Sequence, residues 1–244
     1  ALADKIEALS EATDRERRFS ADVAHELRTP LSALANASSM LAADIDQLPA
    51  QTRRPMELVV EGVTRLRRLV EDLLELSRLD SGQQAVTLER LTLGDAIAAT
   101  VRAGGWEDVV RVVAAPATVV TDRHRLDRVI GNLISNAVVH GGGPVTVSIG
   151  QSVAEVTVTV TDTGPGMTDE ALAHVFDRFA KASTGPARAG SGLGLAIASE
   201  NARLLGGAIR VASAPGEGAA FTLVLPRRDD HEPATWDDAT VVTG

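Results

Sequence analysis

The sequence lacks cysteine, is poor in lysine and has no long apolar segment. Without cysteine, the chain can form neither a disulfide framework nor a thiolate metal site. No apolar run approaches the roughly 18 residues that a helix needs to cross a bilayer, and no signal peptide is visible. A formal net charge of −9 argues against a nucleic-acid surface, which would require a basic patch. We therefore expect a soluble globular chain with no nucleic acid among its partners.

The 244 residues are enough for one large domain or two small ones. The first residue is not methionine, and the opening residues already follow a helical pattern, so we interpret the chain as a piece of a longer protein. Residues 227–244 contain five acidic and two basic side chains. We expect this acidic tail to be disordered.

Two long helices, separated by a polar stretch, are predicted between residue 2 and about residue 80. Pro49 and Pro55 are expected to act as breakers between them. The first helix has an apolar stripe at helical spacing, made of Val23, Leu27, Leu31 and Leu34. The second has a near-heptad stripe, made of Met56, Val59, Val63, Leu66, Val70, Leu73 and Leu76. Since two helices cannot bury such a seam alone, we expect a four-helix bundle formed by two copies.

From about residue 85 the pattern changes to short strands and amphipathic helices, which predicts an α/β layer domain. Apolar residues alternate with threonine in the segments 145–149 and 156–162, as in half-buried antiparallel strands. Further strands are predicted at 208–212 and 219–225. Helices are predicted at 94–102, 123–140, 169–174 and 192–205.

The segment HELRTPL, residues 25–31, combines a histidine, an acid and a proline within two helical turns. Helical spacing places His25 away from the apolar stripe, with Thr29 one turn further on the same face. Glu26 can hydrogen-bond one imidazole nitrogen, which leaves the other as a nucleophile. Pro30 lacks an N–H group and should kink the helix beside His25. We interpret His25 as reactive, although a solvated histidine on a bent helix is the alternative.

A nucleotide site is indicated by several segments, although no Walker-type phosphate loop occurs. Asn132, Asn136 and His140 recur every four residues along the flank of the predicted helix 123–140. Amide oxygens suit a hydrated Mg²⁺ that phosphates already hold. A merely polar helix flank would give the same pattern.

Asp162 ends the strand 156–162, and strand parity places it on the covered face. A buried acid needs a partner such as the exocyclic amine of adenine, unless it only caps the following turn. The glycine-rich turn GSGLGLAIA, residues 190–198, runs directly into a helix whose N-terminus favours phosphate. Glycines that serve helix packing are the alternative there.

A segment between these motifs, residues 175–190, is rich in small residues after its two phenylalanines, which is typical of a mobile lid. Three cations in it could meet phosphate charge or simply solvate the loop. They are Arg178, Lys181 and Arg188. Lys181 stands out because Lys5 is the only other lysine.

Taken together, these segments resemble the sensor histidine kinases of bacterial two-component systems, over roughly residues 15–226. Five motifs occur in the family's order: FSADVAHELRTPL resembles the H box, NLISNAVVHG the N box, DTGPGM the first G box, FDRF the F box and GSGLGLAIA the second G box. The resemblance implies a helical hairpin forming a dimeric four-helix bundle, followed by an α/β two-layer sandwich of the Bergerat ATPase type.

The same resemblance implies a division of the chain into functional parts. Residues 1–18 would be a signalling-helix linker, 19–81 a dimerisation and histidine phosphotransfer domain, and 82–226 a catalytic ATP-binding domain. It also implies a parent protein anchored in the plasma membrane by a missing N-terminal part, with the present piece in the cytoplasm.

Roles for individual residues follow from the resemblance. ATP with Mg²⁺ would phosphorylate His25, with Glu26 as general base, and the phosphoryl group would pass to an aspartate of a response regulator. Thr29 would position water for removing that phosphate. Asn136 would hold the metal near Asn132, and Asp162 would recognise adenine. The pocket and lid hinges would be shaped by Gly164, Gly166, Gly190, Gly192 and Gly194, together with Leu193.

One position departs from the family pattern and keeps other functions open. Val139 stands where the family usually has a lysine or arginine, so a phosphate contact is lost, and His140 replaces a frequent tyrosine. A catalytically weak nucleotide-binding scaffold is therefore one alternative. A chaperone-like or gyrase-like ATPase is another, although such proteins lack an upstream His-Glu helix.

Overall fold

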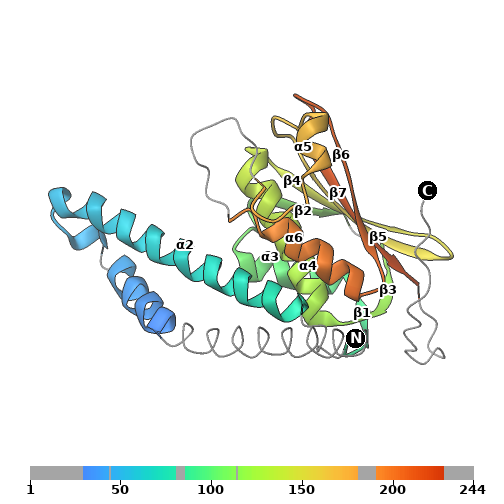
Figure 1. Ribbon diagram of the computed structural model, residues 1–244, viewed down its shortest axis with the longest axis horizontal. Coiled ribbons are helices and arrows are strands. Elements are labelled where there is room, and N and C mark those ends of the chain that lie inside the picture. The colour runs from blue at the N-terminus through green and yellow to red at the C-terminus, as the bar shows by residue number, and fades with distance from the viewer. Residues whose placement is uncertain (1–29, 44, 81–85, 114, 181–190, 228–244) are drawn as a thin grey trace, which may run out of the picture.

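The computed structural model describes residues 30–43, 45–80, 86–113, 115–180 and 191–227, and the following statements concern these ranges. Residues 30–43 are helical, and the 3-10 turn η1 (Ile45–Gln47) leads into helix α2 (Ala50–Asp80). Figure 1 shows α2 as a long arm whose C-terminal end meets the rest of the molecule. No helix in these ranges combines the length and apolarity needed to cross a bilayer.

The start of α2 corrects one prediction, because Pro55 lies inside the helix and not before it. The helix begins directly after Pro49, whose carbonyl oxygen accepts hydrogen bonds from Thr52 N at 2.9 Å and Arg53 N at 3.1 Å. Pro49 is thus the real breaker. Pro55 removes a single helical N–H donor near the N-terminal end, and the 31-residue helix continues past it.

The second part of the chain contains a five-stranded sheet with the order β2-β4-β5-β7-β6. Its strands are β2 (Val110–Val113), β4 (Val145–Gln151), β5 (Glu155–Asp162), β6 (Ala208–Ser213) and β7 (Ala219–Pro226). Only β2 and β4 pair in parallel; the other neighbours are antiparallel. A separate antiparallel pair joins β1 (Glu89–Thr92) to β3 (Thr118–Thr121).

Three helices cover one face of this sheet, which confirms the predicted two-layer α/β sandwich (Figure 1). They are α3 (Leu93–Gly104), α4 (Arg123–Gly141) and α6 (Gly194–Leu204); the short helix α5 (Asp169–Ala173) lies after β5. The predicted stripe of α4 is fully buried, with Leu126, Ile130, Leu133 and Ala137 at most 1% exposed. Valines of β4 and β5 meet it, while the alternate threonines of β5 are half-buried or exposed.

The predicted helices and strands of this domain match the observed ones to within two residues at each end, but three strands were missed. β1, β2 and β3 are only four residues long. β1 has the sequence ERLT and buries only Leu91, so it offers no alternation to detect. Their pairing partners lie far away in the sequence, and the tertiary structure selects them.

Part of the apolar seam formed by residues 30–43 and α2 is exposed in a single chain, whereas Met56, Val63 and Val70 are half-buried. Leu34, Val59, Leu66 and Leu73 are each about half-exposed, at 48–53%. Leu76 is an exception, because it is 3% exposed and packs against the sandwich domain. These exposed apolar side chains support dimerisation, and covering of the seam by a second copy stays a prediction.

Leu66→Gln should weaken self-association, because it removes an apolar side chain from the middle of this seam and thereby about 1.5–3 kcal/mol of burial in each subunit. Light scattering at micromolar concentration measures the effect. Arg65→Gln is the matched control, since this neighbouring side chain is exposed and lies outside the apolar stripe. Equal masses for the two variants would contradict the expected interface.

Candidate nucleotide site

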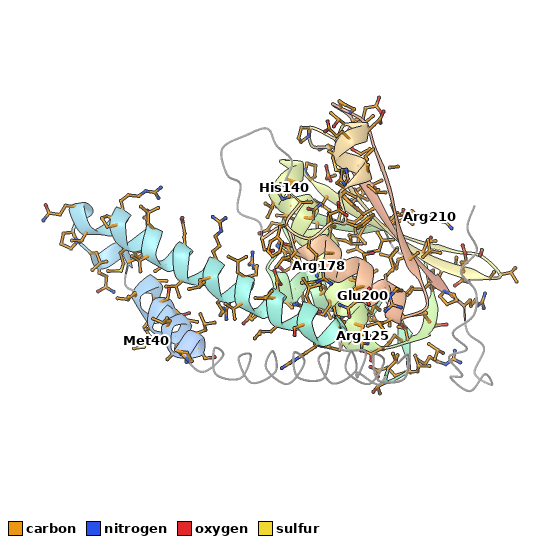
Figure 2. All side chains as sticks on the ribbon, in the orientation of Figure 1. Met40, Arg125, His140, Arg178, Glu200 and Arg210 are labelled. Carbon is orange, nitrogen blue, oxygen red and sulfur yellow. The ribbon has the colours of Figure 1, made fainter. Side chains whose placement is uncertain are left out.

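Helix α4 carries the predicted amide flank next to its buried face. Asp122 begins the helix by accepting a hydrogen bond from Arg125 N at 3.0 Å, and Gly142 ends it in the left-handed conformation, with φ 63°. Asn132 and Asn136 are half-buried on this helix, while His140 is exposed near its C-terminal end (Figure 2). The spacing predicted from the sequence thus places one row of polar side chains along the edge of the core.

Asn132 has a buried amide nitrogen that finds no hydrogen-bond partner among the described residues. Its Oδ1 lies 3.2 Å from the position that a Cβ would take at Gly194, the first residue of α6. Buried amide groups are nearly always hydrogen-bonded, so an orphaned Nδ2 between α4 and the start of α6 favours a polar ligand or water there.

Asp162 lies on the covered face of the sheet, as strand parity predicted, and is 6% exposed. Its Oδ1 accepts a hydrogen bond from Gly164 N at 2.9 Å, so it also caps the turn. No cation pairs with it within the described ranges. A buried carboxylate with one backbone donor retains the capacity to accept further hydrogen bonds, which an amine of a ligand can supply.

Glycines bring Asp162 and the end of α4 into contact. A Cβ at Gly141 would lie 2.5 Å from Asp162 Cβ, and a Cβ at Gly164 would lie 2.7 Å from Gly141 Cα. Such distances are shorter than real Cβ contacts, so both positions require glycine. The close approach joins the C-terminal end of α4 to the loop that follows β5.

Gly166 is explained by packing within the same loop. It has φ 67°, and a Cβ there would lie 1.9 Å from the carbonyl oxygen of Ala214, in the turn between β6 and β7. Two hydrogen bonds hold the loop on this turn: Gly216 N donates to Pro165 O at 2.7 Å, and Met167 N donates to Ser213 Oγ at 3.0 Å. Gly166 therefore allows the loop after β5 to pack against the turn between β6 and β7.

The glycine-rich turn before α6 is anchored at its base. Phe179 N donates to Gly192 O at 2.8 Å, and both residues have positive φ, 63° and 71°. A Cβ at Gly192 would lie 2.8 Å from Ala180 O. The side chain of Leu193 is 1% exposed and packs with Leu76 of α2, so only its backbone can contribute to a ligand site.

The remaining predicted site residues are less informative. Arg178 is exposed near the start of the predicted lid (Figure 2). His25, Glu26, Thr29, Lys181, Arg188 and Gly190 lie outside the described residues. No group of three or more His, Asp or Glu side chains within the described ranges is arranged to hold a metal ion. A metal here would depend on amide oxygens together with the phosphates of the nucleotide.

Comparison with known proteins assigns the two parts of the chain. Residues 15–82 match the family model of the His Kinase A (phospho-acceptor) domain, and residues 121–229 match the histidine kinase-, DNA gyrase B- and HSP90-like ATPase. The signal transduction histidine-protein kinase AfsQ2 of Streptomyces coelicolor is 42% identical over 91% of this chain and 43% of its own length. The chain belongs to the sensor histidine kinases.

Further comparisons agree with this assignment. The sensor histidine kinase MtrB of Mycobacterium tuberculosis is 36% identical over 96% of this chain and 43% of its own length. Full-length ShkA, solved in complex with AMPPNP, superposes with a TM-score of 0.68 over 86% of this chain and 45% of its own, at 28% identity. The chain thus spans less than half the length of the curated relatives it matches.

A contact between helix α2 of the phospho-acceptor domain and the ATPase domain was not anticipated. Its apolar part contains Leu76 and Leu79 from α2 with Leu193 and Ile197 from the ATPase domain. The polar part contains Arg128, which donates to Glu75 and lies 3.7 Å from Asp72. No sequence pattern indicates this contact, because both sets of residues resemble ordinary helix faces until the two domains are placed together.

Asp72 is the most buried charged group of this contact, at 6% exposed. Burial raises the pKa of its carboxyl above the ordinary value of 3.8. The Ser191 hydroxyl bonded to it and the Arg128 and Arg68 charges lower the pKa, while the Glu71 charge raises it. The net direction is upward, so the folded contact favours the protonated acid.

Asp72→Asn should therefore stabilise the protein at neutral pH, because asparagine accepts the serine hydrogen bond without burying a charge. Protonated Asp72 contributes its full stability below pH 3.8, and this contribution is lost as the pH rises through the raised pKa. The melting temperature of wild type, relative to the variant, should therefore fall as the pH rises above 3.8 and through the raised pKa of Asp72. A gain of about 1 kcal/mol corresponds to about 2–4 °C in Tm. A pH-independent difference would contradict this account.

Gly166→Ala should destabilise the ATPase domain more than Gly142→Ala. Both positions have positive φ, which costs an L-residue about 1–2 kcal/mol, but a methyl group at Gly142 would meet no atom within 4 Å, whereas Gly166 abuts the Ala214 carbonyl. Thermal unfolding of the two variants measures the difference. Equal losses would show that backbone conformation alone requires glycine at residue 166.

Proposed function

We propose that this chain is the catalytic core of an ATP-dependent protein-histidine kinase. The observation that carries the proposal is Asp162, a buried carboxylate without a cationic partner in the described ranges, placed against Gly141 at the C-terminal end of α4. Such an acid can accept a hydrogen bond from the exocyclic amine of adenine. The orphaned amide of Asn132, beside the first residue of α6, supports phosphates or their hydrating water nearby.

The donor set fits Mg²⁺ bound together with ATP. Asn136 is half-buried on the same flank as Asn132, and its amide oxygen is a hard, neutral ligand. Mg²⁺ usually keeps several waters and is bound by few protein groups plus substrate phosphates. Asn136 would hold the ion, whose charge would offset that of the phosphates. His140, exposed near the end of the helix, would lie at the rim of the base site.

Phosphoryl transfer to His25 is the proposed reaction. A neutral imidazole nitrogen of His25 would attack the terminal phosphorus of ATP as the bond to the bridging oxygen breaks and ADP leaves. Glu26 would orient the imidazole and take up its proton. The phosphoryl group would then pass to an aspartate of a response-regulator receiver domain, and Thr29 would position the water that later removes it.

Two alternatives remain as second candidates. The ATPase family model also covers gyrase-like and HSP90-like enzymes, but the phospho-acceptor match over residues 15–82 favours a kinase. A weakly active scaffold is motivated by Val139, which lies half-buried where the family usually has a phosphate-binding cation. Arg178, Lys181 and Arg188 would then supply more of the positive charge that faces the phosphates.

The whole protein is proposed to be a dimeric sensor in the plasma membrane, with this piece in the cytoplasm. The curated relatives named above are sensor or signal transduction kinases about twice as long as the present chain. The uncovered seam of the helical arm supports dimerisation.

His25→Gln should abolish incorporation of the terminal phosphate of ATP, because the nucleophile is lost, while ATP binding stays at the wild-type level.

Asn136→Ala should instead weaken binding of Mg²⁺-ATP and slow labelling at least tenfold, since a metal ligand is removed. Labelling with radioactive ATP and titration calorimetry separate the two effects. The phosphate should be acid-labile and base-stable.

Each outcome has a clear counterpart. Label that survives in the His25→Gln variant would place the acceptor elsewhere. Wild-type labelling by Asn136→Ala would remove that residue from the metal site. Nucleotide binding and hydrolysis without any phosphoprotein would favour the gyrase-like ATPase.

A further inference from the structure

The glycine-rich turn is hydrogen-bonded through Ser191 to helix α2, the second helix of the phospho-acceptor domain. Ser191 Oγ donates to Asp72 Oδ2 of α2 at 2.9 Å and accepts from Leu193 N at 3.1 Å. Leu193 is the residue immediately before α6, so the serine closes the turn that leads into the helix facing the proposed phosphates. A charged group of one domain thereby contacts the phosphate-binding turn of the other.

Asp72 is held in place from several sides. Arg128 of α4 lies 3.7 Å from its Oδ1 and also donates to Glu75, one turn further along α2. Glu75 Oε1 accepts from Asn201 Nδ2 at 2.9 Å, and Asn201 Oδ1 accepts from Arg125 at 3.2 Å. Figure 2 shows Arg125 where the C-terminal end of α2 meets the ATPase domain. The acceptor for the serine proton is therefore fixed by a network.

A serine hydroxyl has only one proton to donate. When α2 contacts the ATPase domain, as in this structure, Ser191 donates that proton to Asp72. Ser191 also precedes Gly192 in the turn that leads into the N-terminus of α6. A phosphate oxygen at this N-terminus would be a competing acceptor of the same proton. The hydroxyl cannot serve both acceptors at once.

We infer that Ser191 is a switch residue whose hydroxyl is shared in alternation by Asp72 and a nucleotide phosphate, so that docking of α2 and nucleotide binding oppose each other. This inference rests on the proposed nucleotide site. Breaking the Asp72 contact frees the hydroxyl for phosphate, and bound phosphate leaves the buried Asp72 without one of its donors. Helix α2 thus regulates nucleotide affinity through one hydrogen bond.

The test is a double-mutant cycle on the whole chain, with ADP affinity measured by titration calorimetry. Asp72→Ala should raise the affinity about tenfold, because the serine proton becomes available to the phosphates. Ser191→Ala should change the affinity little when Asp72 is present, but lower it about tenfold in the Asp72→Ala background. This non-additivity is specific to a shared hydroxyl.

Two controls isolate the hydrogen bond. Glu71→Ala removes the same charge from the adjacent residue of α2, whose exposed side chain pairs with Arg67, and should leave ADP affinity unchanged. Adenosine has no phosphate, so its binding should be the same in wild type and Asp72→Ala.

The results that overturn the inference differ from those that overturn the proposed function. Unchanged ADP affinity in Asp72→Ala would refute the switch. So would a gain that persists in the Ser191→Ala background, or a parallel gain for adenosine, because either would indicate loss of charge or of docking in general. Absence of ADP binding by every variant, wild type included, would instead refute the nucleotide site itself.

Discussion

The candidate site depends on the close approach between the end of α4 and the loop after β5. Gly141 and Gly164 allow the two backbones to come within a distance that no side chain would permit, with Asp162 between them. This approach places the C-terminal end of the helix that carries the amides next to a buried carboxylate. The proposed adenine recognition and metal binding both require that juxtaposition. A change that separates the two backbones would therefore disturb base and phosphate recognition together.

The contact between α2 and the ATPase domain has two parts with different physical roles. Burial of the four aliphatic side chains is non-directional and supplies affinity. The hydrogen bonds of Asp72, Glu75, Arg128, Asn201 and Ser191 are directional, and each buried charge becomes costly when its partner is removed. They therefore restrict where on α2 the domain can dock. The contact thus combines a non-directional apolar part with a polar part that defines the position.

Much of the fold could be predicted from the sequence because the strongest patterns are local. The alternation of valine and threonine in β4 and β5, and the buried stripe of α4, follow from the periods of strand and helix alone. Strand parity also placed Asp162 on the covered face. Pro55 was misassigned because a proline near the start of a helix removes little when the helix is long. The short strands β1, β2 and β3 have too few residues to show a period.

The sequence alone determines three features: the family motifs, the main helices and strands of the sandwich, and the row of amides on α4. Each depends on residues that are close together in the sequence. The reason why Gly166 must be glycine emerges from the packing, because the Ala214 carbonyl that it approaches lies 48 positions further along the chain. The same is true of Leu193 and Ser191, whose partners Leu76 and Asp72 belong to another domain. A side chain that belongs to a nucleotide motif can equally serve a contact between domains, and only the packing of α2 against α6 shows that these two do.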